Sequence, residues 1–72
     1  MPQHRRNITR KRVQAVAGYW TLVYRAAHAR VRAFGQHTAR AITLLNIENA
    51  ERRDEPSSRE FEVSILHALE GR

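Results

Sequence analysis

Cysteine, long apolar runs and strand patterns are all missing from this 72-residue sequence. Without cysteine the chain has neither disulfides nor thiolate metal sites. No run of about 18 apolar residues is present to form a transmembrane helix, and no apolar segment after the basic start indicates a secretory signal. No segment alternates with period two and no Asn-Gly turn occurs, so strands are not expected. The sequence therefore predicts a single all-helical domain over residues 1–72.

The small size of the chain sets a second limit. A chain of this length buries only about 60% of the surface of its unfolded state, so a lone fold would be marginally stable. Disulfides, metals or oligomerisation are the usual remedies, and the lack of cysteine leaves oligomerisation. We therefore expect a homodimer.

Acidic residues are absent from the first 40 positions. That half carries nine basic residues, whereas residues 41–72 carry four basic and seven acidic ones. Twelve of the thirteen basic residues are arginines, whose planar guanidinium group suits phosphate. The charge split predicts a polyanion site on the first half. A mitochondrial presequence shares this character, but the apolar pattern continues here without a boundary for cleavage, and we expect a cytoplasmic protein.

A first helix is predicted over residues 8–34, where apolar residues recur at steps of three and four. Residues 1–7 lack this periodicity and are interpreted as a basic arm, with Asn7 or Thr9 as the N-cap. Gly35 is placed to end the helix. We expect Trp20 to lie at the centre of the apolar face and to anchor the core. The face consists of Val13, Val16, Ala17, Trp20, Val23, Tyr24, Ala27, Val31 and Phe34.

Two further helices are predicted. In the second, over residues 36–53, apolar residues spread around most of the cylinder, which indicates burial on several sides and is the main reason to expect a partner chain. The short link at Gly35 predicts that the first two helices form an antiparallel hairpin, and two hairpins would make a dimeric four-helix bundle. Pro56 interrupts the pattern, and Ser57 with Glu60 fits a capping box that opens a third helix over residues 58–70.

A polar stripe is predicted on the first helix, away from its apolar face. Two small residues in the same sector, Gly18 and Ala29, leave room for a nucleic-acid backbone to approach. Phosphate contacts of this kind give affinity without sequence readout. The predicted nucleic-acid-binding residues of the arm and first helix are Arg5, Arg6, Arg10, Lys11, Gln14, Thr21, Arg25, His28 and Arg32.

Other interpretations of these residues stay open. Most charged runs are solvated helix faces, although such faces usually mix both signs. Tyr19, Trp20 and Tyr24 fit core positions better than a stacking platform for single strands. The first helix is too long for a helix-turn-helix unit, so binding along a duplex backbone is favoured over major-groove readout.

No catalytic or metal-binding pattern is evident. The histidines do not follow the spacing of a metal site such as H-E-x-x-H, and His67 fits a partly buried core position better than a ligand. The serines, histidines and acids form no nucleophile motif, and the acids show no pairing typical of acid–base catalysis. We expect no enzymatic activity, no catalytic residues, no cofactor, no metal, no small-molecule substrate and no membrane partner.

The end of the chain carries a family resemblance. Pro56-Ser57 is followed by Leu66-His67-Ala68-Leu69-Glu70-Gly71-Arg72, after a long helix and a second helix. This order resembles the nodavirus-type viral RNA-silencing suppressors, which are small helical hairpins with a short third helix that pair into a four-helix bundle and bind double-stranded RNA. The segment differs in having more residues between Pro56 and Leu69. The resemblance implies one further RNA-binding residue, Arg40 on the second helix.

These observations favour a sequence-independent, double-stranded RNA-binding protein of viral type that suppresses RNA silencing by shielding RNA. One alternative is a small phage or regulatory protein that docks on a host enzyme such as RNA polymerase, which the acidic second half favours. Another is a basic structural protein of a ribosome-like particle.

Overall fold

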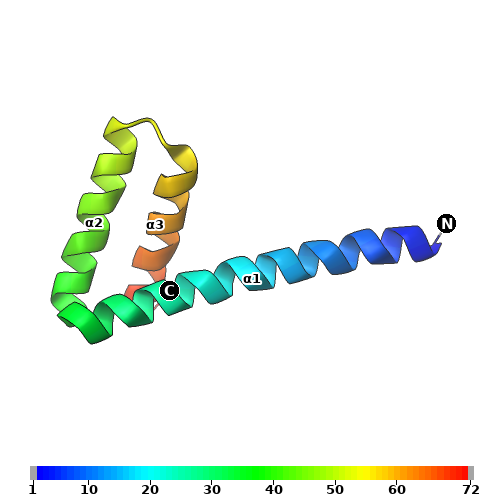
Figure 1. The fold of residues 1–72 in the computed structure, drawn as a ribbon, viewed down its shortest axis with the longest axis horizontal. Helices are drawn as coiled ribbons and strands as arrows, with labels where there is room; N and C mark the ends of the chain where they lie inside the picture. Colours follow the sequence, from blue (N-terminus) through cyan, green and yellow to red (C-terminus); the bar gives the residue numbers. More distant parts are fainter. Residues whose placement is uncertain (1, 72) are drawn as a thin grey trace.

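Three α-helices make up the fold (Figure 1). The computed structural model describes the backbone of residues 2–71 and the side chains of residues 16–71. The helices are α1 (Pro2–Phe34), α2 (Gln36–Arg52) and α3 (Pro56–Leu69). No strand occurs in the backbone of residues 2–71, so the predicted all-helical class is confirmed.

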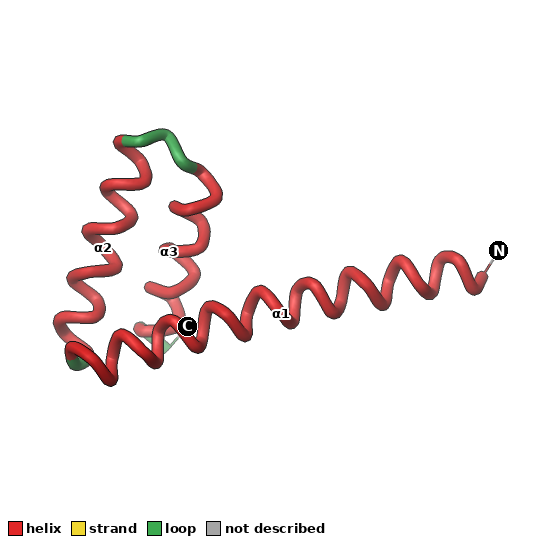
Figure 2. Tube along the Cα trace, in the orientation of Figure 1, coloured by secondary structure: helices red, strands yellow, loops and turns green. Residues whose placement is uncertain are grey.

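The two shorter helices form the hairpin of this fold. Figure 2 shows α2 and α3 side by side and antiparallel, with α1 crossing the end away from their connecting turn. Helix α2 packs more extensively on α3 than either does on α1. The predicted hairpin of the first two helices is therefore wrong. Two antiparallel helices need a connecting loop of about two to five residues, whereas only Gly35 lies between α1 and α2. The link is therefore too short for α1 and α2 to fold back on each other.

Helix α1 is longer than the sequence pattern indicated. Its 33 residues span about 50 Å at 1.5 Å per residue, and the longest dimension of the molecule is 50 Å. The helix begins at Pro2, so a basic arm over residues 2–7 and an N-cap at Asn7 or Thr9 are both wrong. Proline suits the first helical position because its φ is already helical and its missing N–H would have no partner there. Met1 lies outside the described residues.

The other helix boundaries follow from single residues. Gly35 ends α1 as predicted, with φ 83° and its N–H donating to the Val31 carbonyl at 2.8 Å. Helix α2 ends within one residue of its predicted limit. Helix α3 begins two residues early, because Pro56 takes the first helical turn and Glu55 the N-cap position. The predicted Ser57 capping box is thus wrong, and no side chain caps this helix end.

The apolar core lies where α3 packs on the middle of α1. Val23, Ala27 and Ile65 are buried at its centre. The Tyr19 ring packs edge-on against Phe61 at 6.1 Å between centroids. The partly buried residues around the centre are Tyr19, Ala26, Phe61, Ala68 and Leu69.

Trp20 does not anchor this core. The residue is 39% exposed, whereas Val23, three residues on, is fully buried. The two side chains point about 60° apart on the helix, and α3 covers the side that carries Val23. The sequence pattern identified the broad apolar sector but misplaced its buried centre.

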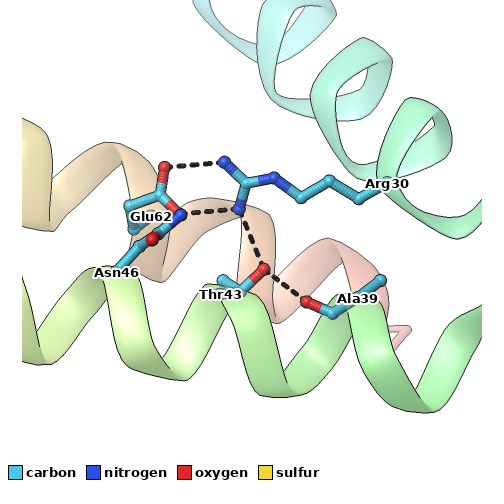
Figure 3. A network of polar contacts seen from close by, with 5 residues as sticks. All are labelled: Arg30, Ala39, Thr43, Asn46 and Glu62. Atoms are coloured by element: carbon cyan, nitrogen blue, oxygen red, sulfur yellow. Dashed lines mark hydrogen bonds and ion pairs between the residues drawn. The ribbon is translucent and has the colours of Figure 1, made fainter. Parts of the chain in front are cut away.

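A partly buried polar network ties the three helices together (Figure 3). Arg30 of α1 donates to both carboxylate oxygens of Glu62 on α3, at 2.6 and 3.0 Å. It also donates to the Thr43 hydroxyl of α2 at 2.9 Å, and that hydroxyl donates to the Ala39 carbonyl. Asn46 gives Glu62 a third hydrogen bond at 3.1 Å. Among the described side chains, no buried polar atom lacks a partner.

Candidate nucleic-acid interface

The polar stripe of α1 follows the helix for most of its length. From Arg10 to Arg32 it extends about 33 Å at 1.5 Å per residue, because the whole segment is one continuous helix. The first five predicted residues lie on the helical backbone, but their side chains fall outside the described part. They are Arg5, Arg6, Arg10, Lys11 and Gln14.

Three predicted residues share one surface feature. Arg25, His28 and Arg32 are exposed and line an open groove of about 700 Å³ between α1 and the end of α3. None of the residues that line this groove is acidic. The complete lining consists of Tyr24, Arg25, Ala27, His28, Ala29, Val31, Arg32, Gln36, Ala68 and Leu69.

Two of these arginines have no acidic partner among the residues whose side chains are described. Among the residues whose side chains are described, the ion pairs join Arg30 to Glu62, Arg40 to Glu70 and Arg59 to Glu51. Neither Arg25 nor Arg32 belongs to one. All acids of the sequence lie at position 48 or later, in α2, α3, the turn between them and, for Glu70, directly after α3. The exposed face of α1 is therefore a one-signed surface suited to phosphate.

Two other predicted residues are engaged within the protein. The Thr21 hydroxyl donates to the Ala17 carbonyl at 2.9 Å, so its proton is not directed at a phosphate. Arg40 is half-exposed and pairs with Glu70 at 3.4 Å, which partly neutralises it. Thr21 and Arg40 are thus less free to contact a ligand than Arg25 and Arg32.

Some residues of the groove were not predicted from sequence. Tyr24 was assigned to the core but is 58% exposed. Gln36 also lines the groove, and its side-chain amide donates to the Leu69 carbonyl at 2.6 Å. His67, expected to fit a partly buried position, is exposed. The pairing of Arg30 with Glu62 was also missed, since 32 residues separate them and no local pattern links them.

The described residues contain no sign of a metal centre or a membrane-spanning helix. Their side chains form no group of three His, Asp or Glu residues placed to hold a metal ion. Within the described residues, no helix is both long enough and apolar enough to cross a bilayer.

The chain was compared with known protein families, with curated proteins and with solved structures, and none of the three comparisons found a match. The functional inference therefore rests on the residues and their arrangement.

Proposed function

We propose that this protein binds duplex nucleic acid along the polar face of α1, through phosphate contacts and without base readout. The observation that carries the proposal is the exposed set Arg25, His28 and Arg32, which line one groove with no acid among its lining residues. Release of the counter-ions condensed on the duplex is a main source of affinity in such binding. A surface with charge of one sign therefore contributes more to affinity than any single contact.

The dimensions of α1 support the same proposal. The stripe from Arg10 to Arg32 covers about 33 Å, close to the roughly 34–36 Å of one turn of B-form DNA, so it is long enough to contact phosphates along a duplex. The first turns of α1 contain Arg5 and Arg6 and no acid, an arrangement that opposes the helix dipole. A bound polyanion would offset both this unfavourable placement and the mutual repulsion of the basic residues.

Duplex RNA is the favoured ligand. An A-form helix presents a wide minor groove with 2′-hydroxyls and is bound mostly by shape, which suits a straight helix with arginines on one face. This choice also follows the sequence resemblance of the C-terminal segment to nodavirus-type silencing suppressors, but it takes no support from the fold, because the hairpin here is formed by α2 and α3. A protein that covers a duplex would shield it from a nuclease by occupancy alone, and suppression of RNA silencing would follow.

A homodimer is part of the proposal. Helix α2 leaves Leu44 and Leu45 substantially exposed, although Ile47 is half-buried within the chain. Pairing of two such faces would place two α1 helices in one particle and double the length of its basic surface. Sedimentation equilibrium tests this, because Leu44→Glu should then shift the protein to monomer. A wild-type protein that remains monomeric across micromolar concentrations would contradict it.

Gel-shift titrations test the binding itself. We expect duplex RNA to bind more tightly than duplex DNA, and either duplex more tightly than single strands, with equal affinity for unrelated sequences. Arg25→Ala with Arg32→Ala should weaken binding to every duplex by a similar factor, because backbone contacts carry no base information.

The matched control is Arg52→Ala with Arg53→Ala. It removes the same charge at the far end of α2, away from α1 (Figure 1). Both residues are exposed. Equal losses of affinity in the two double variants would mean that net charge alone acts, and the proposed face would be wrong.

A further inference from the structure

The groove between α1 and α3 continues into an exposed apolar strip. Val16, Trp20 and Tyr24 follow one another at steps of four on α1, and the first and last are each 58% exposed. Tyr24 also lines the groove, where Val31 and Leu69 extend the apolar surface. From Val16 to Val31 this surface measures about 22 Å along α1 at 1.5 Å per residue.

The strip and groove together have the form of a helix-binding site. An amphipathic helix recognised in a groove uses apolar residues at i, i+3, i+4 and i+7, and 22 Å corresponds to about four helical turns. The rings of Trp20 and Tyr24 lie 6.1 Å apart and form a continuous apolar contact. Exposed aromatic side chains of this kind supply much of the energy at protein interfaces.

The charge around the groove indicates the chemistry of the occupant. Arg25, His28 and Arg32 line it, and no acid does. Glu70, the acid that directly follows the lining residue Leu69, is paired with Arg40. A basic helix would be repelled here, whereas an acidic one would gain ion pairs on the flank of its apolar contact.

A second copy of this chain does not fit that chemistry. Another α1 would bring its own acid-free basic surface against the first. The outer part of α2 offers Leu44 and Leu45, but that helix carries two arginines and two glutamates, so it presents no excess of acid. Helix α3 is acidic, but its Phe61 and Ile65 are used within the chain.

We propose that the α1–α3 groove and the Val16–Trp20–Tyr24 strip bind an acidic amphipathic helix of a partner protein. Such a helix would cover Arg25 and Arg32, so it would compete with duplex nucleic acid for the same face. The docking itself is independent of the proposed function, and only the competition depends on it.

Intrinsic fluorescence gives a direct test, because Trp20 is the single tryptophan of the chain. The probe is a tryptophan-free 18-residue peptide with leucines at i, i+3, i+4 and i+7 and glutamates elsewhere. The comparison peptide replaces every glutamate by lysine. We expect the glutamate peptide to bind and to shift Trp20 emission to shorter wavelength, and the lysine peptide to do neither.

Matched variants locate the site. Tyr24→Ser should weaken binding of the glutamate peptide about tenfold or more, because it removes the aromatic surface that the peptide would bury. Leu22→Ser is the control on the same helix. It is also 58% exposed but points about 160° away from Tyr24, and we expect no change. Arg25→Glu with Arg32→Glu should reverse the preference and favour the lysine peptide.

Several results would overturn the proposal. One is equal binding of the two peptides, and another is glutamate-peptide binding that leaves the emission of Trp20 unchanged. Without peptide, Trp20 emission could shift to shorter wavelength as the protein concentration rises, with self-association by sedimentation over the same range. That result would assign the surface to a second copy of the chain. Duplex RNA binding without peptide binding would remove the docking proposal and leave the proposed function. Peptide binding without RNA binding would do the opposite.

Discussion

The pairing of Arg30 with Glu62 is the most consequential single contact of the fold. Their side chains are only 20% and 13% exposed, and Thr43 and Asn46 complete the set of hydrogen bonds. Removal of one member of a buried pair leaves an uncompensated charge, which costs far more than loss of a surface pair.

Arg30→Ala should therefore destabilise the protein by about 3 kcal/mol, since the Glu62 carboxylate loses its counter-ion in a mostly buried place. Urea unfolding followed by circular dichroism measures this. The control is Arg59→Ala, which breaks an exposed pair with Glu51 and should cost less than about 1 kcal/mol. Similar losses in the two variants would mean that the network contributes no more than a surface contact.

The same network predicts a dependence of stability on pH. Burial by itself raises the pKa of Glu62, but the hydrogen bonds from Arg30 and Asn46 and the charge of Arg30 outweigh it and hold the pKa below its ordinary value. A carboxyl with a lowered pKa in the folded state stabilises the protein above its unfolded pKa, near 4.3. That contribution is lost as the pH falls through the folded pKa.

Glu62→Gln removes this titration. Between about pH 5 and pH 3, we expect the free energy of unfolding to fall less steeply in the variant than in the wild type. Urea unfolding at several pH values gives the slope of the unfolding free energy against pH for each protein. Identical slopes would show that Glu62 does not contribute to the acid response.

At the scale of the helices, replacement by alanine should change stability in opposite directions at two glycines, Gly18 within α1 and Gly35 in the link to α2. Gly18 is helical, and an added Cβ would meet nothing within 4 Å. Gly18→Ala should raise stability by up to about 1 kcal/mol through helix propensity. Gly35 has φ 83°, so Gly35→Ala should cost about 1 kcal/mol. Thermal unfolding of the pair tests this, and a shift of the same sign in both would contradict it.

Much of this helical arrangement could be read from the sequence. The apolar spacing predicted three helices, and Gly35 and Pro56 marked their limits to within two residues, apart from the start of α1. Packing could not be read in this way. Steps of three and four define an apolar sector wide enough for Val23 and Trp20 alike, and only the position of α3 decides which is buried.

The exposure of Trp20 changes what its replacement should do. A buried tryptophan would cost about 3–5 kcal/mol on replacement by alanine, which would unfold a chain of this size. Because Trp20 is 39% exposed, we expect Trp20→Ala to remain helical by circular dichroism, with only a modest loss of stability. Complete unfolding of the variant would place Trp20 in the core after all.

At the scale of the whole molecule, the candidate site combines a predicted part with an unpredicted one. The acid-free stretch of 40 residues identified the basic surface, and α1 presents Arg25 and Arg32 together as the helical period requires. The groove beside them was not predictable, because Ala68 and Leu69 reach it from the opposite end of the chain through the α2–α3 hairpin.

The charges divide the molecule into a basic side at α1 and a side that carries the acids. The acids lie in α2, α3, the turn between them and the position after α3, and α1 passes beyond these helices with basic residues along its length (Figure 1). A polyanion would therefore approach from the α1 side, where attraction is not opposed by nearby carboxylates.

The salt dependence of duplex RNA binding tests the central claim most directly. The logarithm of the binding constant should fall linearly with the logarithm of salt concentration, and each lost phosphate contact should reduce the slope by roughly 0.9. For Arg25→Ala with Arg32→Ala, the account predicts a slope smaller by about 1.8, whereas Arg52→Ala with Arg53→Ala should leave it unchanged. An unchanged slope in the first double variant would contradict the account, because the exposed arginines of α1 would then not contact phosphate.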